Sequence, residues 1–121
     1  MPAFPTMEDY REVFRIEHLW LQKPQKRLMQ IHLRSPSHAL TATELATQMG
    51  YPNHGSVNVH YGSLAARVSE RLIKNGVKWT VPVGEPASVS MVIFERDGPE
   101  EHWRWIMRPE LVEALTSLGW R

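Results

Sequence analysis

Five side chains that can both donate and accept hydrogen bonds lie close together near the middle of the chain. They are Asn53, His54, Ser56, Asn58 and His60. In the major groove of DNA, an asparagine pairs with adenine through two hydrogen bonds, and serine and histidine reach several base edges. These five residues are therefore candidate base contacts if they lie at the start of a helix that enters the groove.

Basic residues are concentrated in the same part of the chain. Residues 20–78 carry eight lysines and arginines against two glutamates, a net charge of +6, whereas residues 1–19 carry −2 and residues 79–121 carry −3. A basic band of this size attracts phosphate, although a solvated helix face is the alternative explanation for the same residues. The candidate contacts to a nucleic-acid backbone are Lys23, Lys26, Arg27, Ser63, Arg67, Arg71, Lys74 and Lys78.

Two predicted helices joined by a turn hold most of these residues. Thr41 followed by Glu44 is typical of a capping box, and Gly50 is the expected left-handed stop of a short first helix. After the turn formers of residues 51–55, a long helix is predicted from Ser56 to about Lys74. Its apolar positions are Val57, Tyr61, Leu64, Ala65, Val68 and Leu72. This arrangement predicts a helix-turn-helix, in which the start of the second helix meets base edges.

The polar side chains of the long helix follow one stripe. Ser56, His60, Ser63, Arg67, Arg71 and Lys74 recur at spacings of three and four, so they share one face, and Asn58 flanks it. Gly62 interrupts this helix and predicts a close crossing with the first helix of the motif. A methyl group there is accordingly predicted to cost about 1 to 3 kcal/mol through overpacking.

The rest of the chain supplies a helical pair before this motif and β-structure after it. Thr6 with Asp9 predicts the start of the first helix, and Pro24 the start of the second. Residues 77–83 alternate as an edge strand, and runs at 89–95 and 102–107 predict a hairpin around a loop at 97–101. Residues 109–118 then predict a short helix. We expect an α+β fold in one domain over residues 1–121: a winged helix-turn-helix with an N-terminal helical pair, a β-hairpin wing and a short C-terminal helix.

Trp103 and Trp105 fall on one face of the second hairpin strand, together with Met107. Paired aromatic side chains of this kind are able to stack on a nucleobase. Burial of both rings against the last helix is the explanation that we favour from the sequence.

Catalytic and metal-binding motifs are absent from the sequence. It has no cysteine, His54 and His60 are six residues apart rather than three or four, and no glycine-rich phosphate loop or Gly-x-Ser-x-Gly element occurs. We therefore expect no enzymatic activity, no metal and no cofactor. No long apolar run and no basic, apolar leader stands in the sequence, so we expect a cytoplasmic protein that does not enter a membrane.

Several runs resemble the N-terminal module that precedes the nuclease domain in HNH-type restriction endonucleases. They are residues 40–46, 50–51, 57–65, 103–111 and 114–120, of which the Asn-x-x-Tyr-Gly-x-Leu-Ala element from Asn58 to Ala65 is the most specific. From first to last they span about two thirds of the chain, in the same order. The resemblance implies a DNA-targeting domain that reads sequence or base modification, and no cleavage, because the nuclease part of those enzymes has no counterpart in this sequence.

The sequence thus predicts a non-catalytic domain that binds double-stranded DNA through its helix-turn-helix. Two alternatives stay open. One is a protein-interaction module, such as a phage-type inhibitor or adaptor, that docks through its tryptophan-rich C-terminal part. The other is a DNA-binding subunit that works with a nuclease on a separate polypeptide.

Overall fold

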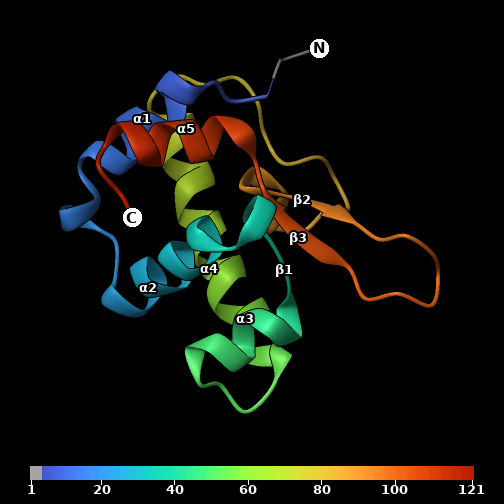
Figure 1. Cartoon of the computed structure of the whole chain (residues 1–121). Helices are drawn as coiled ribbons and strands as arrows, with labels where there is room; N and C mark the ends of the chain where they lie inside the picture. Colours follow the sequence, from blue (N-terminus) through green and yellow to red (C-terminus); the bar gives the residue numbers. More distant parts are fainter. Residues whose placement is uncertain (1–3) are drawn as a thin grey trace.

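The computed structural model describes residues 4–121, and these form five α-helices and a three-stranded antiparallel sheet (Figure 1). The helices are α1 (Met7–Arg15), α2 (Lys23–Arg34), α3 (Ala42–Met49), α4 (His54–Lys74) and α5 (Pro109–Ser117). The strands are β1 (Ala39–Thr41), β2 (Val92–Glu95) and β3 (Arg104–Met107), and short 3-10 helices lie at Glu17–Leu19, Pro36–His38 and Ala87–Ser90. The predicted α+β class is confirmed.

Local capping signals set the helix boundaries near the predicted positions. At the start of α3, the Glu44 amide donates to the Thr41 hydroxyl at 3.1 Å, and the Thr41 amide donates to the Glu44 carboxylate at 2.9 Å. Gly50 ends this helix with a φ of +76°, the left-handed conformation that favours glycine. The long helix begins at His54, two residues before the predicted start, because the Asn53 side chain accepts a hydrogen bond from the Gly55 amide.

The sheet joins three distant segments around one tryptophan. Its order is β1-β3-β2, and Trp105 of β3 lies opposite Leu40 of β1 on one side and Phe94 of β2 on the other. Strand β1 was not predicted, since three residues carry no alternation signal of their own. Its place in the sheet comes from pairing with β3.

Helix α4 runs through the middle of the molecule, and the other elements are arranged around it (Figure 1). Helices α1 and α5 lie side by side near its carboxyl end, α3 packs near its amino end, and the hairpin of β2 and β3 projects to one side. The predicted apolar positions of α4 are all buried: Val57, Tyr61, Leu64, Ala65, Val68 and Leu72 are at 0% exposure. One apolar face of α4 therefore packs against the core, and the opposite face is exposed to solvent.

A buried histidine ties α2, α4 and β3 together. His32 is fully buried; its Nε2 lies 2.7 Å from the Trp105 carbonyl oxygen and its Nδ1 lies 2.9 Å from the Tyr61 hydroxyl. Because a carbonyl only accepts, Nε2 carries the proton and donates it to Trp105. Burial lowers the pKa of His32 to about 4, so the neutral ring accepts the Tyr61 hydroxyl proton at Nδ1. Both polar atoms of the ring are satisfied only in this arrangement.

Two predictions of local structure after α4 are wrong. Residues 77–83 form no strand, because this segment finds no neighbouring strand to pair with and Pro82 has no amide to donate. The hairpin loop is also longer than predicted, since β2 ends at Glu95 and β3 begins at Arg104. An ion pair closes the base of this loop, with the Arg104 guanidinium 3.0 Å from the Asp97 carboxylate.

The close helix crossing predicted at Gly62 is wrong as well. A Cβ at this position would have no atom of another element within 4 Å. Because the site is open, we now expect Gly62→Ala to raise the free energy of unfolding by about 1 kcal/mol through helix propensity and a less flexible unfolded chain. Urea denaturation of the variant tests this expectation, and a loss of stability would show that something packs against this side of α4.

Candidate functional site

The predicted base-contacting residues gather at the amino end of α4, but they divide between its two flanks. His54 and Asn58 are one helical turn apart on the side that faces the hairpin, and both are exposed. Ser56 and His60 lie on the other flank, where the His60 ring stacks on Tyr51 with centroids 5.3 Å apart. Asn53 serves as the helix cap, so its side-chain oxygen already accepts the Gly55 amide proton at 2.9 Å.

A cavity of about 490 Å³ separates the start of α4 from the hairpin. Its polar lining comes from the start of α4, from the start of α3, and from the loops before β2 and β3: His54, Asn58, Thr41, Thr43, Glu85 and His102. Its aromatic lining comes from the hairpin: Phe94, Trp103 and Trp105. This cavity was not predicted from the sequence, although the alternation that puts Trp103 and Trp105 on one face identified part of its aromatic lining.

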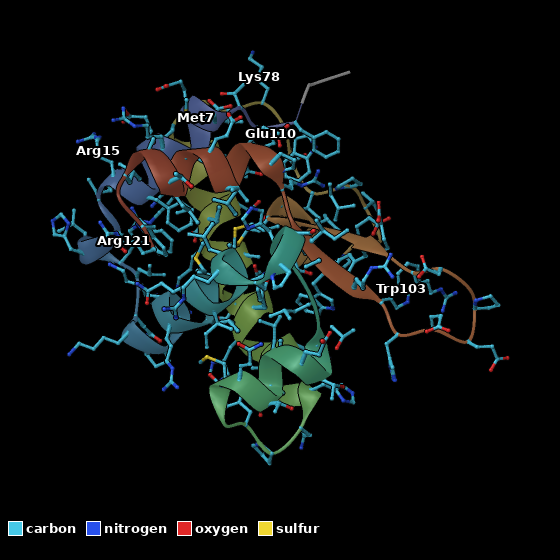
Figure 2. All side chains as sticks on the ribbon, viewed as in Figure 1. Met7, Arg15, Lys78, Trp103, Glu110 and Arg121 are labelled. Atoms are coloured by element: carbon cyan, nitrogen blue, oxygen red, sulfur yellow. The ribbon has the colours of Figure 1, made fainter. Side chains whose placement is uncertain are left out.

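The two hairpin tryptophans have different environments. Trp105 is 7% exposed, so its predicted burial is confirmed, and it packs edge-on against Phe94 and Tyr61 at centroid distances of 5.0 and 5.2 Å. Trp103 is 48% exposed, and the Arg96 guanidinium lies 4.3 Å from its ring centroid. Trp103 therefore keeps surface that another flat group can cover (Figure 2 labels it at the hairpin).

Little positive charge surrounds this end of the molecule. Among the described residues that line the cavity there is no lysine or arginine, and Glu85 is the one charged side chain. Residues 35–66 contain a single charged residue, Glu44, and residues 95–104 hold two arginines against four acids. The candidate base contacts thus lie on a surface that is neutral to weakly acidic.

Three of the predicted backbone contacts are held by the fold itself. Lys26 forms an ion pair with Glu17 at 2.8 Å and lies 5.0 Å from the Trp120 ring centroid. Arg67 donates to the Trp20 carbonyl oxygen at 3.1 Å, and the Arg71 guanidinium lies 5.0 Å from the Trp20 ring centroid. The two arginines hold the segment between α1 and α2 against α4, and Lys26 ties the same segment to α2.

The other predicted backbone contacts are spread along the molecule. The 21 residues of α4 span about 30 Å, so Lys74 lies at the opposite end of this helix from the base-contact residues. Lys78 follows α4, far from the turn between α3 and α4 (Figures 1 and 2). Ser63 is exposed on the flank of α4 that also carries His60. Lys23 and Arg27 are exposed on α2, where Arg34 shares their face at helical spacing.

Within residues 4–121 no three histidine, aspartate or glutamate side chains come together as a metal site would require. Over the same residues, none of the helices has both the length and the apolar character that crossing a bilayer demands.

Comparison of the chain with protein-family models, curated proteins and solved structures gave no match. The resemblance to the endonuclease module therefore stays a prediction from the quoted motifs.

Proposed function

We propose that this chain is a winged-helix domain that binds duplex DNA without catalysing a reaction, with the first two turns of α4 in the major groove. The observation that carries the proposal is the order of the elements. Helix α2 is followed by β1, then by the α3–turn–α4 pair, and then by a hairpin whose strand β3 pairs with β1. A hairpin that follows a long second helix and pairs with a strand before it is typical of winged helix-turn-helix domains, and this order supports the proposal.

The side chains at the start of α4 suit base reading. Asn58 and His60 are exposed, and Val57 and Tyr61 on either side of them are fully buried, so the helix is held rigidly while these polar groups face solvent. An asparagine on such a helix is able to pair with adenine through two hydrogen bonds. Asn53 caps α4 and holds its first turn in place. Ser56 is half-buried and supplies a secondary contact to the DNA.

The phosphate contacts that fit this arrangement come from α2. Lys23, Arg27 and Arg34 lie on one exposed face, and none of them forms an ion pair within the described residues. Arg67 and Arg71 are engaged with Trp20, and Lys74 and Lys78 are remote from α3. We accordingly assign the backbone contacts mainly to the α2 face.

This assignment predicts a moderate dependence of DNA affinity on salt. With about three phosphates neutralised, the logarithm of the association constant should fall against the logarithm of the salt concentration with a slope near −3. Fluorescence anisotropy with a labelled duplex measures it. Arg27→Ala should make the slope shallower by about one, whereas Arg15→Ala, a control on α1, should leave it unchanged. Binding that is absent at low salt would contradict the proposal.

A second candidate function is a protein-interaction module, and the weak charge around the start of α4 favours it. Val59 is 69% exposed in a stretch, residues 35–66, that contains no lysine or arginine, and Trp103 of the hairpin is 48% exposed. Protein interfaces are enriched in such aromatic side chains and depleted in charge. A photo-crosslinking residue at position 59, compared with one at exposed Leu19, tests this candidate: a protein captured from position 59 alone, together with no affinity for DNA, would support it over DNA binding.

A further inference from the structure

The cavity between α4 and the hairpin has the size of a small-molecule site. Its volume of about 490 Å³ falls within the range of about 300 to 1,000 Å³ that ligand pockets occupy. Helices α3 and α4 both begin beside it, and Phe94 and Trp105 form its floor through their edge-to-face contact at 5.0 Å. Most of the walls therefore belong to helices and strands, whereas Trp103 and His102 come from the hairpin loop just before β3, and Glu85 and Pro86 from the segment after α4.

The aromatic walls suit a flat ring. Trp103 is half exposed and lines the cavity, so its indole is available to stack on a planar ligand. Phe94 is half-buried and lines the same space. Stacking on tryptophan and phenylalanine is how proteins hold single bases, because every base presents a π-face.

The polar lining suits the edge of a base rather than a phosphate. The side chains of His54 and Asn58 have no hydrogen-bond partner within residues 4–121, so they are free to donate and accept. The amino ends of two helices favour a carbonyl oxygen, and the Glu85 carboxylate accepts from an amino group. The described lining residues include no lysine or arginine, and the Glu85 carboxylate would repel an anionic group, so a neutral base suits the cavity better than a phosphate.

We propose that this cavity binds a nucleobase, stacked beside Trp103 and read along its edge by Asn58. The base belongs either to bound DNA, as an unpaired or extruded nucleotide, or to a free nucleoside. If the base comes from bound DNA, the inference rests on the proposed function, because the start of α4 must then meet the duplex.

The first arm of the test uses free nucleosides and the five tryptophan indole signals in a ¹H–¹⁵N spectrum. We expect the signals of Trp103 and Trp105 to shift as nucleoside is added, and those of Trp20 and Trp120, outside the cavity, to stay in place. Trp103→Ala should weaken nucleoside binding by roughly tenfold through lost stacking. Leu19→Ala, an exposed apolar residue of the segment between α1 and α2, is the matched control and should bind as the wild type does.

The second arm compares a fully paired duplex with one that holds a single central mismatch. A mismatched base costs less to extrude, so the mismatched duplex should bind several-fold more tightly, and Trp103→Ala should remove this preference while both duplexes still bind.

Nucleoside shifts at Trp103 without a mismatch preference would support the base site with a free nucleoside as its source. Duplex binding with neither nucleoside shifts nor a preference would overturn the base site and leave the proposed function standing. Nucleoside shifts without duplex binding would support the base site and contradict the proposed function, and the absence of all binding would overturn both.

Discussion

Lowering the pH from 7 to 4 is expected to reduce the free energy of unfolding by about 3 kcal/mol through His32 alone. The folded protein holds this ring neutral, because burial lowers its pKa to about 4, whereas the ring takes up a proton near pH 6.5 in the unfolded chain. Between these two values the unfolded state binds more protons, so stability rises with pH in that window and is lost as the pH falls through it. A protonated ring would also lose the hydrogen bond that Nδ1 accepts from Tyr61.

Urea denaturation at several pH values between 4 and 7 measures this effect. The comparison is with His32→Gln, whose side chain does not titrate and retains one donor and one acceptor. The variant should be less stable at pH 7 but should lose less stability on acidification, since all other titrating groups are shared. If wild type and variant lost the same stability between pH 6.5 and pH 4, His32 would not be held neutral in the folded state.

Replacing Trp105 by alanine is expected to cost about 3 to 5 kcal/mol of stability. The ring is 7% exposed and packs against Tyr61 of α4 and Phe94 of β2, so its removal leaves a cavity where helix, sheet and His32 meet. The matched control is Trp103→Ala, two residues earlier on the same face and 48% exposed, which should cost less than about 1 kcal/mol.

Thermal or urea unfolding of the two variants separates the two roles. Equal losses for Trp103→Ala and Trp105→Ala would mean that both rings are core residues, and Trp103 would then be a poor candidate for stacking on a ligand. A small loss for Trp105→Ala would contradict the packing between the hairpin and α4.

The helices were predictable because their signals are local. The capping boxes at Thr6 and Thr41, the glycine stop at Gly50 and the apolar stripe of α4 are each written within a few residues, and each is present in the structure. Strand β1 was not predictable, since its three residues become a strand only by pairing with β3, which comes more than sixty residues later in the chain. The strand predicted at 77–83 failed for the converse reason, because alternation without a partner does not make a strand.

The candidate site was predictable in part for the same reason. Helical spacing correctly put Arg67, Arg71 and Lys74 on one side of α4, but it could not show that Trp20 covers this side and engages Arg67 and Arg71. Nor could the sequence show the cavity, since its lining joins Thr43 of α3, Asn58 of α4 and Trp103 of the hairpin loop. Such convergence depends on tertiary packing, which no local pattern records.

Selection from a pool of duplexes with a randomised core tests the central claim most directly. If α4 reads base edges, the protein should enrich a defined sequence, and each base pair that it reads should be worth about 1 to 3 kcal/mol over a substituted one. Asn58→Ala should keep its affinity for random duplexes and lose the preference at one position. Recovery of all sequences alike would contradict base reading by α4, and recovery of no duplex at low salt would contradict DNA binding itself.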